Sequence, residues 1–201
     1  MIRVLLAEDQ ALVRGALKAL LEMEGDIVVV GEAARADEVV PLARETQPHV
    51  ALLDIELPGG SGLIAAAALR ESLPECRVVM LTTFGRPGYV QRALAAGAHG
   101  FLLKDAPAAE LAVAIRRVLQ GQRVVAPDLA LMALQEGPSP LTQRESEVLA
   151  AAAGGATTAD ISASLHLSEG TVRNHLSSAI QKLGARTRTE AVRIAKERGW
   201  L

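Results

Sequence analysis

Short apolar runs alternate with longer stretches of helical periodicity through residues 1–121. The runs are rich in Val, Leu and Ile, which is typical of strands buried on both faces of a sheet. Strands that alternate with helices predict a parallel sheet with helices on both faces. The predicted strands are residues 2–7, 27–30, 50–54, 78–83 and 100–103, and the predicted helices are residues 11–23, 37–45, 62–72, 88–96 and 107–121.

Two of these helical stretches carry further local signals. In the first, Leu12, Ala16, Leu20 and Met23 lie at helical spacing and form one apolar face. In the second, Pro41 lacks a backbone N–H and its ring clashes with the preceding turn. The second helix is therefore predicted to start late or to kink at Pro41.

The pattern changes after residue 121, where Pro127, Gly137, Pro138 and Pro140 surround one apolar run at residues 129–134. The run predicts a short helix, and the Gly-Pro-Ser-Pro stretch predicts a linker. Beyond it, four short helices are predicted from their start signals, which are Thr142 with Glu145, Thr157 with Asp160, Ser168, and Thr187 with Glu190. The chain is thus expected to comprise an α/β domain (1–121), a linker with a short helix (122–140) and a small all-α domain (141–201).

Within the all-α domain, the turn at residues 166–168 joins predicted helices at residues 158–165 and 169–183 closely enough to form a helix-turn-helix. The second helix has two faces: Val172, Leu176, Ile180 and Leu183 lie on one, and Asn174, Ser177 and Gln181 lie on the other. The polar face suits DNA reading, and equally suits the solvated side of a small protein-binding bundle.

Composition narrows the class of protein. The 201 residues carry a net charge of −2, and residues 141–201 are the basic part, with 8 Lys/Arg against 6 Asp/Glu. Cys76 is the single cysteine and the four histidines are scattered, so neither a disulfide framework nor a thiolate or histidine metal site is expected. No apolar run is long enough for a membrane span and no signal peptide is evident. We expect a soluble, cytoplasmic protein with no membrane partner.

Chemically active side chains stand where four of the predicted strands end. Asp54 closes one strand before a Pro-Gly-Gly turn, Glu8 and Asp9 follow another, and Thr82 and Lys104 end two more. The carboxyl ends of parallel strands share one edge of the sheet, where ligands bind. Clustered carboxylates favour a hard cation such as Mg²⁺, and a phosphoryl group needs a cation, an ammonium and a hydrogen-bond donor. Taken alone, Asp54 could merely break the strand or cap the helix after Ser61.

These motifs, in this order and spacing, resemble the receiver domain of two-component response regulators. The resemblance implies that Asp54 is the phosphoacceptor and that Mg²⁺ binds Glu8, Asp9, Asp54 and the backbone carbonyl of Glu56. It also implies that Thr82, Phe101 and Lys104 bind the phosphate and switch the domain. Glu8 stands where many relatives have Asp, and an altered Mg²⁺ affinity is expected from the longer side chain. The implied receiver fold is a five-stranded, doubly wound, flavodoxin-like sheet.

The C-terminal domain resembles the LuxR-type DNA-binding domain. The residues that carry this resemblance are Leu141-Thr142, Arg144-Glu145, Thr171 to His175 and Lys182-Leu183. Together the two domains are similar to the NarL/FixJ family, and residues 7–10, 81–89 and 171–174 are most similar to its DesR type, which regulates membrane-lipid desaturation. The implied DNA-binding residues are Ser168, Thr171, Arg173, Asn174, His175, Ser177 and Lys182. Ser177 replaces a lysine of some relatives, which should weaken phosphate attraction or change base preference.

The resemblance implies a transcription regulator whose receivers pair when Asp54 is phosphorylated. The implied partners are a sensor histidine kinase, an inverted repeat in promoter DNA, RNA polymerase and a second copy of the chain. Target genes are expected in lipid desaturation or in a transporter operon. The chain is not expected to be an enzyme beyond its own Mg²⁺-dependent phosphorylation and dephosphorylation. Two alternatives are a phosphatase with Asp54 as nucleophile and Glu56 as acid, and a receiver that works without phosphate.

Overall fold

The computed structural model describes residues 1–83 and 85–201 and divides the chain into two compact units. The first unit comprises Met1–Gly85 and Val90–Leu131, and the second comprises Arg86–Tyr89 and Met132–Leu201. The division thus falls within α6 (Pro127–Glu136), the helix predicted around residues 129–134, and also cuts the first residues of α4 (Pro87–Ala95) from the rest of that helix.

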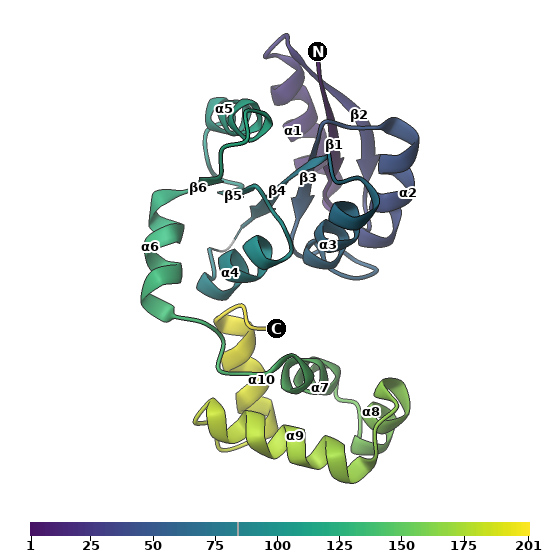
Figure 1. Ribbon diagram of the computed structural model, residues 1–201, viewed down its shortest axis with the longest axis vertical. Helices are drawn as coiled ribbons and strands as arrows, with labels where there is room; N and C mark the ends of the chain where they lie inside the picture. Colours follow the sequence, from purple (N-terminus) through teal and green to yellow (C-terminus); the bar gives the residue numbers. More distant parts are fainter. Residues whose placement is uncertain (84) are drawn as a thin grey trace. The chain divides into compact units, whose positions relative to one another are not determined.

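The first unit is a parallel sheet in the order β2-β1-β3-β4-β5-β6. Helices α1 and α5 cover one face, and α2, α3 and α4 cover the other (Figure 1). The strands are β1 (Ile2–Ala7), β2 (Ile27–Ala33), β3 (Val50–Asp54), β4 (Arg77–Thr82), β5 (Gly100–Leu103) and β6 (Val124–Val125), and the helices are α1 (Ala11–Glu22), α2 (Ala36–Thr46), α3 (Gly62–Ser72), α4 (Pro87–Ala95) and α5 (Ala108–Leu119). The predicted doubly wound α/β fold is confirmed.

The sheet contains one strand more than predicted. The two residues of β6 pair with β5, Val124 opposite Gly100 and Val125 opposite Phe101. They lie in the stretch that the sequence pattern assigned to the linker. A strand of two residues is too short to show any periodicity, and what makes it a strand is the free edge of β5 beside it.

Helix α2 corrects a local prediction. It starts at Ala36, ahead of the predicted start, and runs through Pro41 to Thr46. The late start is therefore wrong. A proline inside a helix removes one backbone hydrogen bond, which the packing of Val39 and Ala43 in the core outweighs here.

The apolar face of α1 lies on the outside of the first unit. Leu12 is 88% exposed, Met23 82% and Leu20 43%, whereas Leu21 is buried in the core with Leu17 packed against it. The helical spacing of Leu12, Ala16, Leu20 and Met23 is real, but the sheet packs against a different side of the helix. Large apolar side chains are thus left exposed along α1, and such side chains are a feature of interaction sites when they form a contiguous patch.

The second unit contains the predicted short helices around one small core. These helices are α7 (Gln143–Ala153), α8 (Thr158–Leu165), α9 (Glu169–Lys182) and α10 (Arg188–Glu197). All four predicted caps are present: the side chains of Thr142, Thr157, Ser168 and Thr187 each accept a bond from the backbone N–H three residues later. Val148, Leu149, Ile161 and Val172 are fully buried in the shared core. This fits a helix-turn-helix formed by α8 and α9 with α7 and α10 as supports.

Among the helices of the described residues, none is both long enough and apolar enough to cross a membrane.

Candidate functional site

The carboxyl ends of β1, β3, β4 and β5 surround a cleft of about 310 Å³ in the first unit. It is lined by Asp9, Gln10, Asp54, Glu56, Thr82, Thr83 and Lys104. Four of these, Asp9, Asp54, Thr82 and Lys104, are the residues that the sequence pattern placed at four strand ends. Glu56 is a fifth predicted site residue, implied by the family resemblance. They lie together because the carboxyl ends of parallel strands share one edge of the sheet.

Lys104 lies between two acids at the floor of this cleft. Its Nζ atom is 2.8 Å from Asp54 Oδ2 and 2.6 Å from Glu8 Oε2. Burial favours the neutral amine of Lys104, but its bonds to Asp54 and Glu8 outweigh burial and raise its pKa. Lys104 therefore remains an ammonium and, by pairing with both carboxylates, keeps Asp54 and Glu8 close together.

Glu8 differs from Asp9 in exposure although the two are neighbours in sequence. Glu8 is completely buried, whereas Asp9 is exposed at the cleft. Burial raises the pKa of Glu8, and the ion pair with Lys104 opposes that rise. Arg14 holds the backbone nearby by donating from Nη1 to the Glu8 carbonyl oxygen at 2.5 Å. Of the acid pair, Asp9 thus faces the solvent and Glu8 faces Lys104.

The loop after Asp54 depends on one glycine. Gly62 starts α3 and donates its N–H to the Ile55 carbonyl at 3.0 Å. A Cβ atom at this position would lie 1.8 Å from the Asp54 carbonyl oxygen, so no larger residue fits without moving the phosphoacceptor candidate. Ser61 caps the same helix by accepting from the Ile64 N–H at 3.4 Å, as predicted. Asp54 is therefore the last residue of β3 and not the cap.

The acids can accommodate a metal. One carboxylate oxygen each from Glu8, Asp9 and Asp54 lies within 4.8 Å of the others. Oxygen ligands in this arrangement suit hard divalent cations. Three carboxylates and one ammonium leave a local charge of about −2, which a divalent cation would neutralise. The residues present thus fit Mg²⁺.

The two remaining switch candidates lie at different depths. Thr82 is nearly buried, lines the cleft, and accepts the Lys104 backbone N–H with its carbonyl oxygen at 2.9 Å. Phe101 is completely buried in β5, opposite Met80 and Val125, and does not line the cleft. Phe84, which belongs to the motif at residues 81–89, lies outside the described residues.

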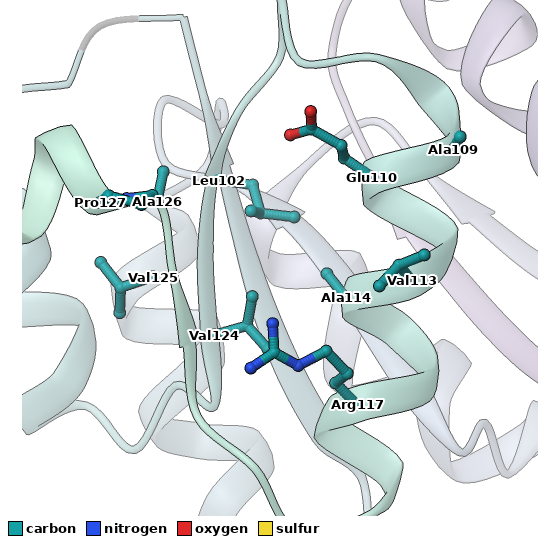
Figure 2. Close-up of a pocket in the computed structure, with 10 residues that line it drawn as sticks. All are labelled: Leu102, Ala109, Glu110, Val113, Ala114, Arg117, Val124, Val125, Ala126 and Pro127. Carbon is teal, nitrogen blue, oxygen red and sulfur yellow. The ribbon is translucent and has the colours of Figure 1, made fainter.

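A separate cavity of about 370 Å³ lies between α5 and β6 (Figure 2). Its lining is apolar apart from Glu110 and Arg117, which lie at opposite ends of the groove along α5. None of the predicted site residues lines it. This cavity is therefore not the candidate site for phosphoryl chemistry, which is the cleft around Asp54 with its acids and Lys104.

In the second unit, α9 presents a polar outer face. Arg173, Asn174, Ser177 and Gln181 are exposed, whereas Val172, Leu176 and Ala179 are buried against the core. The Arg173 side chain is 65% exposed, and its Nη1 atom is 3.8 Å from Glu169 Oε2. An exposed pair at this distance contributes little energy, so Arg173 is available for another partner.

The other predicted DNA-binding residues have contacts within the unit. Ser168 accepts the Thr171 N–H at 3.1 Å, and the two hydroxyl oxygens are 2.8 Å apart. Ser168 and Thr171 therefore stabilise the start of α9. His175 is half-buried, and Lys182 Nζ is 2.7 Å from Glu145 Oε2.

Glu145 is a residue whose wider contacts the sequence pattern missed. Besides its predicted bond to the Thr142 N–H, at 2.7 Å, it accepts from Ser178 Oγ at 2.6 Å and from Lys182. The capping motif signals only the first of these bonds, because Ser178 and Lys182 lie 33 and 37 residues further along the chain. Burial tends to raise the pKa of Glu145, but Lys182, Ser178 and Thr142 outweigh it and lower the pKa from 4.5 to about 2.

We expect Glu145 to make the second unit sensitive to acid. Its lowered pKa contributes about 3 kcal/mol of stability above pH 4.5, and this is lost as the pH falls towards about 2. Trp200, the single tryptophan, packs in the core of this unit, so its fluorescence reports the unfolding of this unit. The unfolding temperatures of wild type and Glu145→Gln should converge as the pH falls through this window. A difference that stayed constant from neutral pH to about pH 3 would contradict the assignment.

Comparison with protein families finds two matches along the chain. Residues 4–116 match the response regulator receiver domain, and residues 139–195 match the bacterial regulatory proteins of the luxR family. The first match covers most of the unit that contains the Asp54 cleft, and the second covers α7, α8 and α9 and most of α10.

Similar proteins share the whole arrangement. The uncharacterized transcriptional regulatory protein YvfU of Bacillus subtilis (strain 168) is 48% identical over 201 residues, covering all of both chains. The transcriptional regulatory protein DesR of the same organism is 46% identical over 200 residues, covering 100% of this chain and 99% of DesR. The expected similarity to the DesR type is thereby confirmed.

Solved structures agree on the fold. The response regulator ChrA of a heme-sensing two-component system is 33% identical, with a TM-score of 0.59 over 100% of this chain and 98% of ChrA. RcsB of Salmonella typhimurium has a TM-score of 0.67 over 98% of this chain and 100% of RcsB. Its identity is 23%, so it supports the fold alone.

Proposed function

This chain belongs to the two-component response regulators that combine a receiver domain with a LuxR-type DNA-binding domain, and we propose that phosphorylation of Asp54 controls its binding to promoter DNA. The main support is the meeting of Asp54, Lys104 and the acids Glu8 and Asp9 in one cleft. We assign residues 1–121 to the receiver, 122–140 to the linker and 141–201 to the DNA-binding domain.

In the proposed chemistry, an Asp54 carboxylate oxygen attacks the phosphorus of a phosphohistidine on the sensor kinase. A P–O bond forms as the P–N bond breaks, and the imidazole keeps the electron pair and takes up a proton. Asp54 is 5% exposed, so a donor reaches it through the cleft. The ammonium of Lys104, 2.8 Å from Asp54, moves with the added negative charge and pairs with the phosphoryl oxygens.

We assign Asp9, Asp54, Glu8 and the backbone carbonyl of Glu56 as the residues that would hold Mg²⁺. When bound, the cation neutralises charge on the phosphoryl oxygens. Asp9 is the exposed acid of the set, whereas Glu8 is already paired with Lys104. The two neighbouring acids therefore have different roles. Asp9 supplies carboxylate oxygens that a cation can reach from solvent, and Glu8 supplies a buried negative charge beside Lys104.

The proposed relay passes through β4 and β5. The Thr82 hydroxyl lies at the cleft and can donate to the phosphorylated side chain. Thr82 is the last residue of β4, which pairs with β5 at Phe101 through Met80. When Thr82 moves towards the phosphate, it leaves space that Phe101 can fill from its buried position in β5. This couples the charge on Asp54 to the outer surface of the receiver.

The proposed result of the relay is pairing of two receivers. The α1 patch, formed by Leu12, Leu20 and Met23, supplies a suitable surface. Burial of such side chains between two copies would contribute roughly 25 cal/mol for each Å² removed from water. Because this surface is already apolar, phosphorylation needs only to shift the receivers from separate copies towards pairs.

We expect Met23→Glu to prevent this pairing. An unpaired carboxylate buried in the contact costs several kcal/mol, which corresponds to dimerisation at least about 100-fold weaker. The measurement is light scattering after size exclusion, with acetyl phosphate and Mg²⁺ present. Ile64→Glu is the matched control, since Ile64 is 67% exposed on α3, across the sheet from α1. Equal dimerisation of Met23→Glu and wild type would exclude the α1 patch.

We further propose that α9 enters the major groove of promoter DNA and that the paired protein contacts RNA polymerase. Arg173, Asn174 and Ser177 lie on its exposed face and would read base edges. The resemblance to the DesR type implies target genes in membrane-lipid desaturation, and a transporter operon is the other proposed target. Selection of bound fragments from genomic DNA, with and without phosphodonor, tests this assignment. Recovery of the same unspecific fragments under both conditions would reject it.

A further inference from the structure

We propose that Glu145 positions α9 for DNA binding and that Lys182 is its counter-ion within the unit, not a contact to DNA phosphate. This inference rests on the proposed DNA-binding role of α9. It concerns which cations of the domain are free to reach DNA, and it revises the role that family resemblance gives to Lys182.

One carboxylate joins two helices here. Glu145 lies in the first turn of α7 and accepts the Thr142 N–H that precedes this helix, at 2.7 Å. It also accepts from Ser178 Oγ at 2.6 Å and from Lys182 Nζ at 2.7 Å. Ser178 and Lys182 are four residues apart, one turn of α9. Glu145 therefore fixes the C-terminal half of α9 against the start of α7.

The burial of Glu145 makes Lys182 necessary to the unit. Glu145 is only 5% exposed, and a buried carboxylate without compensation is strongly destabilising. Among the described contacts of Glu145, the Lys182 ammonium is the one that brings a full positive charge. The pair with Glu145 holds the Lys182 ammonium on the α7 side of α9, and moving it out towards a DNA phosphate would leave this carboxylate uncompensated.

The direction of Lys182 around the helix agrees with this role. At about 100° per residue, Ser178 and Lys182 lie on one flank of α9, which faces α7 through Glu145. Arg173, Ser177 and Gln181 lie on the exposed outer face instead. The Lys182 side chain keeps 36% exposure, but its ammonium is 2.7 Å from Glu145 Oε2. Arg173 is 65% exposed and 3.8 Å from Glu169, so it offers its positive charge to DNA more openly.

The test is DNA binding by the full chain over a series of salt concentrations. The probes are a duplex selected by the wild-type chain from random-sequence DNA and an unrelated duplex. Lys182→Met and Glu145→Gln should each weaken binding to the selected duplex about tenfold, because each breaks a charged hydrogen bond that holds α9. Both should leave the salt dependence unchanged. The double variant should bind as each single one does, because both changes break the same contact.

Two controls accompany these variants. Lys196→Met removes the same charge from an exposed position on α10 and should alter neither affinity nor salt dependence. Arg173→Ala should weaken binding and reduce the preference for the selected duplex, as expected of a residue that touches bases. Fluorescence of the buried Trp200 verifies that each variant is folded.

The opposite role for Lys182 predicts opposite results. If Lys182 contacts phosphate, Lys182→Met lowers the slope of log K against log salt by about 0.9. Glu145→Gln would then free the ammonium and tighten binding, an outcome that overturns the proposal even if Lys182→Met fails to fold. Failure of the wild-type chain to select any duplex from random-sequence DNA would instead refute the DNA-binding role of α9 itself.

Discussion

We expect the Asp54→Asn chain to incorporate no phosphoryl group and to remain unresponsive to phosphodonor. The amide oxygen is a poor nucleophile, and the substitution removes the negative charge that Lys104 Nζ contacts at 2.8 Å. Intact-mass spectrometry after incubation with acetyl phosphate and Mg²⁺ measures the effect. Wild type should gain one phosphoryl group per chain, and the gain should be absent in Asp54→Asn.

Two further variants show whether the cleft works as proposed. Asp9→Ala should lose Mg²⁺-dependent phosphorylation while remaining folded, because Asp9 is exposed and lies outside the core. Glu56→Gln should keep it, since the proposal uses only the backbone carbonyl of Glu56. If wild type instead turned over a generic phosphate ester continuously, and Glu56→Gln stopped this turnover, the chain would be a phosphatase with Glu56 as the acid.

The second large effect is expected in DNA binding. The phosphorylated chain should bind an inverted repeat about 10² to 10⁴ times more tightly than a single half-site. The gain comes from pairing, because the second α9 then binds at a high effective concentration and needs no new type of contact. Half-site centres should lie about 10 bp apart, so that both helices enter the same side of the duplex.

Fluorescence anisotropy with repeats of different spacing measures this gain. Insertion of about 5 bp turns one half-site to the opposite side of the duplex and should remove most of it. Met23→Glu should bind the intact repeat no better than a single half-site, which connects the α1 patch to DNA binding. Tight binding by Asp54→Asn, together with indifference to spacing, would show that phosphate-driven pairing is the wrong mechanism.

Local signals in the sequence determined the elements and the residues at their ends. The strand that ends at Asp54, the cap at Ser61 and the capping box of Thr142 and Glu145 appear in the structure as predicted. Each of these features depends on residues a few positions apart. The meeting of Asp54 with Lys104 was also predictable, because parallel strands bring their carboxyl ends to one edge of the sheet.

What the sequence left open depends on partners that are distant along the chain. Periodicity identified the apolar face of α1, but only packing on the sheet decided that Leu21 is buried while Leu12 and Met23 are exposed. The two residues of β6 become a strand only beside β5.

The roles of charged residues also depend on partners that are distant along the chain. The sequence placed Glu8 and Asp9 side by side after one strand, yet burial and Lys104 separated their roles. It likewise placed Lys182 on a presumed DNA-binding helix, and only the tertiary structure brought Glu145 against it from another helix. Residue type and spacing thus determine the local structure and the available chemistry, whereas burial and distant ion pairs decide which charges remain free to act.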